Sequence, residues 1–378
     1  MAEKIKVGFP VPLSGTYGTE AKEQLTAAEL AVDEFNASGG LDGREAEIVV
    51  RDTKLLKELA QSSAEELCTK EKVHVMVGAL KSEDMVEISK ICAKHGILYN
   101  AISQSDTILE IHNRRRSTFH EGWDFHMGGG AIGRYAFSHY GNRVAVLSGI
   151  QELGEHFTRA LLHVGTQIGV DFIYNDKHPV GCQDFRPFLK RIQELKPEVL
   201  VFNCFGADQL NAVKQSRELG IFEDTRIVLA NFSVTQRMIG GADVFEGVVG
   251  ACGYYWRLEE KFASAKEFNK NYRVRSGGVA PTTYSAFGYV GTKTVLTAIQ
   301  RAKTLETEKL IREMLAMRFD FCRGPQFYRG LDHQSVQPVV IVESKSESDM
   351  QSPDDFFEIL EVNEFLGPRT FLVSRETV

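Results

Sequence analysis

The sequence lacks the features that mark membrane-spanning and nucleic-acid-binding proteins. No apolar run approaches the roughly 18 to 20 residues that a membrane helix needs, and the start MAEKIKVGF has no apolar signal-peptide core. Acidic residues outnumber basic ones, with 51 Asp and Glu against 44 Lys and Arg, so the formal net charge is -7. This balance argues against nucleic acid or an anionic membrane as the main partner, because both attract basic surfaces.

Motifs for common enzyme chemistry are also missing. The chain has no P-loop and no GxSxG motif, and His120, Glu121 and His126 do not have the HExxH spacing of zinc proteases. Residues 128–133 fit GxGxxG, but no convincing strand precedes them, as a dinucleotide-binding site requires. We therefore expect no catalytic residues, no metal and no cofactor, and an α/β enzyme is the least supported class of function.

Cysteines are few and scattered, without a CxxC pair or the spacing of metal ligands. The six are Cys68, Cys92, Cys182, Cys204, Cys252 and Cys322. Four fall within apolar segments, where cysteine packs as a small hydrophobic residue. Cys68 and Cys92 fall on successive predicted helices of one domain, so they can pair in an oxidising compartment, and both the thiol and the disulfide state are compatible with the sequence.

The composition is that of a globular protein with room for two domains, since the 378 residues are 43% hydrophobic and 25% charged. Strand-like and helix-like patterns alternate from residue 4 to about 105 and again from about 125 to 232. This order predicts two parallel α/β domains with right-handed crossovers and a cleft between them. Helices are predicted later, at 259–273, 282–302 and 308–317, and the acidic stretch after residue 344 is expected to be a surface extension.

One stretch, from Val73 to Ser105, contains two consecutive strand-to-turn junctions that carry small polar residues. Ser82 follows the first strand, and Ser103, Gln104 and Ser105 follow the second. Ends of adjacent parallel strands meet at one sheet edge, where small ligands bind, and the free N–H groups of a helix start favour an anion. We therefore predict half of a carboxylate-binding site here. The alternative is that a serine in such a turn is only a helix N-cap, a role that the sequence also predicts for Ser82.

Several motifs occur in an order that is found in one known family. They are VGFPVPLSGTYG, FNASGGLDGREAEIVVRD, the turns ALKS and ISQS, and the late GPQFYRGLDHQSVQPVVIVE. Together they resemble the periplasmic leucine/isoleucine/valine-binding proteins, the solute receptors of branched-chain amino-acid type ABC transporters, over nearly the whole chain except the acidic tail. The resemblance implies a type I periplasmic-binding fold with two Rossmann-like lobes joined by three hinge crossovers, near residues 120, 250 and 325. The implied lobes are 1–120 with 250–325, and 121–249 with 326–378.

The resemblance also implies where a ligand binds. The family's contacts to the ligand carboxylate fall on Ser82, Ser103 and Ser105. In the second lobe, Leu153 replaces a tyrosine of the amino-acid binders, and Phe205 keeps a later aromatic ring without a hydroxyl.

A third difference from the family concerns the ligand's ammonium group, because the acidic residue that takes it falls on Asn231. A buried ammonium without its carboxylate partner costs about 3 to 5 kcal/mol, which is roughly a hundredfold or more in affinity. We therefore expect an unmodified amino acid to bind poorly unless Asp124, Glu152 or Asp208 replaces the lost charge.

Three aromatic residues, Tyr17, Trp123 and Phe205, are placed where they can line the cleft, which suggests a carboxylate with an apolar body. Their alternative role is ordinary packing at strand ends and crossovers, because large aromatic side chains dominate protein cores. A branched or aromatic acid, a 2-oxo acid or a hydrophobic amino acid fits this description, and acids without an α-amino group are favoured.

The leading functional prediction is an extracytoplasmic receptor that closes around a small carboxylate and presents it to an ABC permease in the inner membrane. Such a receptor is periplasmic in its mature form, after signal-peptide removal, and does not insert into the membrane. The alternative is a cytoplasmic ligand sensor of the same fold, like the amide-sensing relatives of this family. The missing signal peptide supports the sensor, whereas the short charged start AEK resembles what remains after signal cleavage and supports export.

Overall fold

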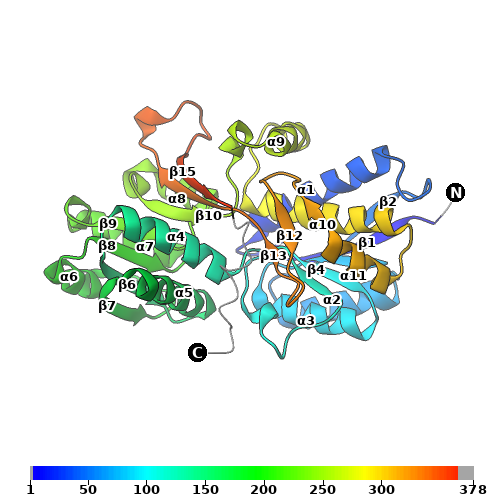
Figure 1. Cartoon of the computed structure of the whole chain (residues 1–378), viewed down its shortest axis with the longest axis horizontal. Helices are drawn as coiled ribbons and strands as arrows, with labels where there is room; N and C mark the ends of the chain where they lie inside the picture. The colour runs from blue at the N-terminus through cyan, green and yellow to red at the C-terminus, as the bar shows by residue number, and fades with distance from the viewer. Residues whose placement is uncertain (1–2, 365–378) are drawn as a thin grey trace.

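Two β-sheets lie side by side, each flanked by helices, and the chain passes between them more than once (Figure 1). The structure is a computed structural model and describes residues 3–364. Among those residues, no helix combines the length and the apolar character that crossing a membrane requires.

The first lobe is built on a five-stranded sheet of order β2-β1-β3-β4-β5 in which every neighbouring pair is parallel. Its strands are β1 (Ile5–Val11), β2 (Ala46–Asp52), β3 (Val75–Gly78), β4 (Leu98–Ala101) and β5 (Thr118–His120). They alternate with α1 (Gly18–Ala37), α2 (Lys57–Thr69), α3 (Ser82–Lys94) and the short η1 (Thr107–Leu109). All residues of β3 and β4 are buried, as expected for central strands of a parallel sheet that is covered on both faces.

The second lobe is built on a seven-stranded sheet of order β15-β14-β10-β9-β8-β6-β7. Its parallel strands are β6 (Arg143–Gly149), β7 (Asp171–His178), β8 (Val199–Asn203), β9 (Arg226–Leu229) and β10 (Val249–Cys252). The helices between them are α4 (Phe125–His139), α5 (Glu152–Ile168), α6 (Arg186–Leu195), α7 (Ala207–Glu218), η2 (Ile221–Glu223) and α8 (Val234–Phe245). The prediction of parallel α/β sheets is therefore confirmed in both lobes.

After β10 the chain returns to the first lobe, where α10 (Thr283–Ala302) packs along α1. Three more helices belong to this region: η3 (Trp256–Glu260), α9 (Ala263–Arg275) and α11 (Thr307–Ala316). A small antiparallel sheet follows, made of β11 (Arg318–Phe319), β12 (Gln326–Tyr328) and β13 (Ser335–Val336).

The small sheet contacts the first lobe through two aromatic residues. The ring of Tyr328 lies 5.0 Å from that of Phe119 on β5, and its hydroxyl is bonded to Asn100 on β4. His333 stacks on Phe119 at 4.3 Å between ring centroids. We therefore propose that the third crossover follows Val336, later than the predicted position near residue 325. The predicted lobe boundaries near residues 120 and 250 stay predictions.

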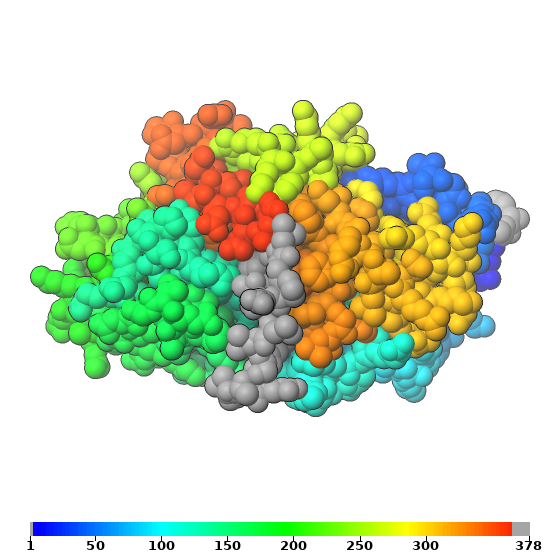
Figure 2. Space-filling view, viewed as in Figure 1, coloured from blue at the N-terminus to red at the C-terminus, as the bar shows by residue number. Residues whose placement is uncertain are grey.

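The acidic C-terminal segment, orange to red in Figure 2, lies at the surface, but the predicted extension is in part regular structure, because one stretch of it forms an edge strand of the second sheet. β14 (Val339–Ser344) pairs antiparallel with β10, and after the short η4 (Glu347–Asp349) β15 (Phe357–Asn363) pairs antiparallel with β14. Phe357 is fully buried against Phe232 and Tyr255. Acidic residues on the outer face of an edge strand concealed this pattern, because edge strands commonly carry charges. The rest of the predicted tail, 365–378, lies outside the described residues.

The six cysteines are free thiols, and Cys68 on α2 and Cys92 on α3 lie beside each other in one apolar cluster. A hydrogen bond from Cys92 lowers the pKa of the Cys68 thiol, whereas burial raises the pKa of Cys92. Pairing of these two residues in an oxidising compartment stays a prediction.

Candidate functional site

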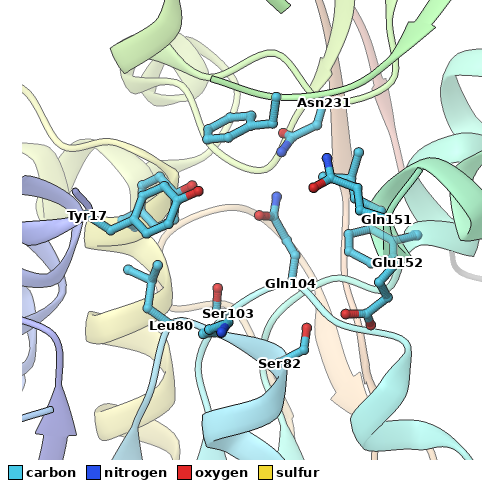
Figure 3. Close-up of a pocket in the computed structure, with 13 residues that line it drawn as sticks. Tyr17, Leu80, Ser82, Ser103, Gln104, Gln151, Glu152 and Asn231 are labelled. Carbon is cyan, nitrogen blue, oxygen red and sulfur yellow. The ribbon is translucent and has the colours of Figure 1, made fainter. Parts of the chain in front are cut away.

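A cavity of about 200 Å³ lies between the two lobes, at the carboxyl ends of the strands of both sheets (Figure 3). Side chains from both lobes line it: Tyr17, Leu80, Lys81, Ser82, Ser103, Gln104, Phe125, Gln151, Glu152, Leu153, Phe205, Asn231 and Tyr284. Seven of the nine residues that the sequence predicts for the site are in this set, namely Tyr17, Ser82, Ser103, Gln104, Leu153, Phe205 and Asn231.

The turn after β3 brings Ser82 to the cavity. Gly78 and Ala79 both have positive φ, at 150° and 68°. An added Cβ on Gly78 would meet the Pro10 carbonyl oxygen at 2.7 Å, so this close approach requires glycine. The N-cap of α3 is Lys81 and it makes no side-chain cap bond, so the prediction that Ser82 caps the helix is wrong. Because the helix starts one residue earlier than the pattern suggested, the Ser82 hydroxyl points to the cavity instead (Figure 3).

The turn after β4 carries Ser103 and Gln104 and is held by a buried imidazole. The Ser103 carbonyl oxygen accepts a hydrogen bond from Nε2 of His120 at 2.5 Å, and Nδ1 of His120 lies 2.6 Å from Oε1 of Gln334. Burial lowers the pKa of His120, although the contacts with Gln334 and Ser103 oppose this shift. Gly122 packs so closely that an added Cβ would lie 1.7 Å from the Ser103 oxygen. Contacts with His120 and Gly122 therefore fix the position of this turn.

The second lobe covers the cavity with side chains from three strand ends. Gln151 and Leu153 follow β6, Phe205 follows β8, and Asn231 follows β9. The amide groups of Gln104, Gln151 and Asn231 point toward the centre of the cavity (Figure 3). Within residues 3–364, none of these three amides hydrogen bonds to another protein group, so their donors and acceptors are available to a ligand.

Glu152 is the one carboxylate among the residues lining the cavity, and one of its oxygens is already engaged. Oε1 accepts hydrogen bonds from the hydroxyl and the backbone N–H of Thr107, at 2.6 and 3.0 Å. The other acids considered as a replacement charge lie elsewhere. Asp124 caps α4 by accepting from the Met127 N–H at 2.7 Å, and Asp208 accepts from the backbone near β7.

Two predicted site residues do not reach the cavity. Trp123 is 1% exposed, and its ring packs on α4, where an added Cβ on Gly128 would lie only 1.8 Å away. Gly128 and the following Gly129 therefore allow close packing of α4 against Trp123 and α5. Ser105 is fully buried, and its hydroxyl donates to Glu152 at 3.3 Å. Ser105 directly follows the lining residue Gln104, and Trp123 is two residues from the lining residue Phe125, but neither of them lines the cavity.

Six lining residues were not in the predicted site: Leu80, Lys81, Phe125, Gln151, Glu152 and Tyr284. Gln151 and Glu152 follow the strand RVAVLSG, so the rule that ligands lie at carboxyl ends of parallel strands could have identified both; Glu152 was considered from the sequence only as a replacement charge. Tyr284 comes from the start of α10, far away in sequence, and no local pattern signals its position.

One wall of the cavity contains the ring of Tyr17 (Figure 3); the ring of Tyr284 also lines the cavity, and the carboxylic acid of Glu20 lies near both tyrosines. Burial raises the pKa of both tyrosines and nearby Glu20 raises it further, so both hydroxyls stay protonated donors. Burial also raises the pKa of Glu23 to about 7, although its hydrogen bond from Thr282 opposes this shift. The wall is therefore uncharged at its surface and apolar in its rings.

Comparisons with known proteins identify the family of the chain and its fold. A family model described as "Periplasmic binding protein" matches residues 4–349. An amino acid binding protein from Pseudomonas aeruginosa is 23% identical over 304 residues, which is 79% of each chain.

Two solved structures of similar shape contain a bound ligand. One is a branched-chain amino acid transporter substrate-binding protein from Streptococcus pneumoniae in complex with isoleucine, with TM-score 0.82 and 21% identity, covering 96% of this chain and 100% of that chain. The other is a solute-binding protein of an ABC transporter from R. palustris in complex with benzoate, with TM-score 0.79 and 18% identity, covering 95% and 96%. At these identities the likeness establishes a shared fold.

Proposed function

The chain belongs to the periplasmic binding protein family, whose members are solute-binding proteins and not enzymes, and we propose that it is the extracytoplasmic receptor of an ABC importer. The proposed ligand is a small carboxylate with an apolar body, enclosed between the two lobes. The closed form binds the ligand more tightly than the open form, because the ligand then contacts both lobes, so binding stabilises closure. An inner-membrane permease then receives the closed form. The protein acts in the periplasm in this proposal.

One observation carries the proposal: hydroxyl-bearing turns of the first lobe face apolar and amide side chains of the second lobe across one cavity, with Glu152 as the one carboxylate among the lining residues. Ser82 stands in the first turn of α3 and Ser103 in the neighbouring turn, which together suit a carboxylate. Phe205 and Leu153 suit an apolar body. Isoleucine and benzoate, which are bound by proteins of the same fold, share this combination of a carboxylate with an apolar group.

Asn231 favours acids without an α-amino group within this class. Its amide supplies no charge to balance an ammonium, and Oε1 of Glu152 is occupied by donors from the first lobe. A 2-oxo group or an aromatic ring leaves no charge unbalanced, and an oxo group can accept a hydrogen bond from an amide N–H.

Thermal unfolding with a matched set of compounds tests the proposal. The set contains leucine, phenylalanine, their 2-oxo acids and benzoate. A ligand that binds only the folded protein stabilises it by about 2.7 kcal/mol at a hundred times its dissociation constant. We expect the oxo or aromatic acids to raise the midpoint and the amino acids to leave it nearly unchanged. If no compound in the set raises the unfolding midpoint, the proposed ligand class is wrong.

The three free amides in the cavity also favour a second candidate, a cytoplasmic sensor of an uncharged amide. Primary amides pair with one another through one donor and one acceptor on each side. Benzamide and 4-methylpentanamide, added to the same set, separate the two functions, because a sensor of this kind responds to the amides and not to the matching acids.

A further inference from the structure

A short segment of the first lobe, residues 105–107, lies between the starts of α4 and α5 of the second lobe. The segment continues directly from Ser103 and Gln104, which line the cavity. Its contacts with the second lobe are made on two sides, by Glu152 on one and by Asp106 on the other. We call residues 105–107, Glu152 and the partners of Asp106 the interlobe clasp.

On the first side of the clasp, one carboxylate oxygen of the second lobe gathers donors from the first. Oε1 of Glu152 accepts from the Thr107 hydroxyl at 2.6 Å and from the Thr107 N–H at 3.0 Å. The Asp106 N–H and the Ser105 hydroxyl lie at 3.3 Å from the same oxygen. Bonds to an ionised acceptor are the stronger kind, so this contact fixes the backbone of the segment.

On the second side, a carboxylate of the first lobe gathers donors from the second. The side chain of Asp106 is 2% exposed, and its Oδ1 accepts from the Phe125 N–H at 2.8 Å. Oδ2 lies 2.8 Å from Nδ1 of His126 and 3.1 Å from Nδ1 of His156. A buried carboxylate is costly without such partners. Each lobe therefore contributes one carboxylate that accepts hydrogen bonds from the other lobe.

One possible metal-ligand atom from each of Asp106, Asp124 and His126 lies within 4.8 Å of the other two, which is close enough for all three to bind one metal ion. Positive charge already reaches this group from the protein, because Nη2 of Arg329 lies 3.8 Å from Oδ2 of Asp124. The imidazoles and this guanidinium account for the cluster as part of the contact between lobes.

We propose that Glu152 and Asp106 are positioning residues that hold the turn carrying Ser103 and Gln104 against the second lobe in the absence of ligand. The clasp then sets the distance between the two halves of the cavity. We call the first-lobe half, with Ser103 and Gln104, the floor, and the second-lobe half, with Gln151 and Asn231, the roof. The clasp also limits how far the lobes separate before a ligand enters. The consequence for ligand binding rests on the proposed function, whereas the contact itself does not.

Hydrogen–deuterium exchange of the ligand-free protein, read by mass spectrometry, tests the clasp. We expect Glu152→Ala to accelerate exchange in peptides covering residues 103–110 by about tenfold or more, because the bonds to a charged acceptor are lost. Glu152→Gln keeps an acceptor without the charge and should give a smaller increase. Glu155→Ala is the matched control, since Glu155 lies on the same helix and bonds to Lys177 at the surface. It should leave these peptides unchanged.

Thr107 supplies a second pair of variants in case the Glu152 variants unfold. Thr107→Val removes the hydroxyl donor and should accelerate exchange in the same peptides, whereas Thr107→Ser should restore slow exchange. Small-angle scattering of the same samples should show a larger radius of gyration for Glu152→Ala than for the parent protein. Unchanged exchange in Glu152→Ala, or an equal change in Glu155→Ala, overturns the proposal.

Ligand measurements separate the two proposals. With 4-methyl-2-oxopentanoate and benzoate as probes, Glu152→Ala should raise the dissociation rate more than it lowers the association rate, because the loosened turn no longer retains the ligand. If neither acid binds the parent protein but exchange responds as expected, the proposed ligand class fails and the clasp stands.

Discussion

The two halves of the cavity are built in different ways. The first-lobe half rests on turns that are held by a buried polar network reaching from β5 to the small antiparallel sheet. In that network Glu121 accepts from Tyr328 at 2.6 Å and from Gln326 at 2.9 Å, and it pairs with the fully buried Arg323. The second-lobe half presents single side chains from strand ends, such as Gln151 and Asn231, whose amide groups make no hydrogen bond to other groups of residues 3–364.

This difference suggests a division of roles between the lobes. A rigid floor suits the part of the ligand that every member of a ligand class shares, here the carboxylate, because preorganised donors cost no rearrangement on binding. Side chains with unused donors and acceptors suit the part that varies. Within the proposed function, changes in the floor should abolish binding, and changes in the roof should alter selectivity.

The largest expected effect comes from breaking the network beneath the floor. Glu121→Gln leaves Arg323 buried without a charge partner, and losing one member of a buried pair costs about 3 to 5 kcal/mol. Denaturant unfolding measures this loss. Glu308→Gln is the matched control, because its bidentate pair with Arg116 is at the surface and contributes little. Equal stability of the two variants would contradict a rigid floor.

The next effect concerns the serines of the floor. Replacing Ser82 and Ser103 together by Ala should weaken binding of the best acid by at least about a hundredfold, because each lost bond to a charged group is worth about 1.5 to 3 kcal/mol. Isothermal titration calorimetry measures the change. Ser62→Ala, an exposed serine on α2, should bind like the parent protein. If the double variant keeps its affinity, the carboxylate does not bind at these turns.

Selectivity should follow from the roof. Asn231→Asp restores a negative charge at the position that differs from the family pattern, and we expect affinity for leucine to rise about tenfold. The same change should weaken binding of the matching 2-oxo acid, whose oxo group would then face a carboxylate. Titration of one variant with both compounds provides its own control. Parallel changes for both ligands would show that residue 231 does not read the α-substituent.

The sequence predicted the floor better than the roof for a physical reason. Both floor turns fall within one contiguous stretch, so strand order alone places Ser82 and Ser103 together. The roof is assembled from three separate strand ends, and Tyr284 is added from the distant α10 of the first lobe, so only packing brings these residues together. Tyr284 and Gln151 therefore escaped prediction, and Trp123 was misplaced because sequence proximity to the cleft says nothing about side-chain direction.

The fold was predictable to a similar degree. Alternating apolar periodicity was enough for the parallel strands, which are buried on both faces. It failed at β15, whose partly exposed face is acidic, so composition concealed an edge strand. The small sheet after α11 was equally difficult, because its two- and three-residue strands carry almost no periodicity.

The smallest expected effect lies where the two halves meet, at His156. Burial alone would lower the pKa of this imidazole, but the contact with Asp106 and the charge of Glu152 outweigh burial and the repulsion from Arg159, so the pKa is raised above its ordinary 6.5. His126 faces the same carboxylate, and Glu155 is adjacent in the chain.

A raised folded-state pKa means that the folded protein binds the proton more tightly than the unfolded chain does. The stabilisation is therefore complete below pH 6.5 and is lost as the pH rises through the raised value. We expect His156→Gln to lower the unfolding midpoint at pH 6 by a few degrees and to have less effect at pH 9. His163→Gln, a half-buried position on the same helix whose ring lies at hydrogen-bond distance from Gln167, is the control without an acidic partner of this kind and should show no such pH dependence. If the unfolding midpoint falls equally at both pH values, His156 stabilises the contact between the lobes by packing and not by its charge. The charged hydrogen bonds between the lobes would then be those of Glu152.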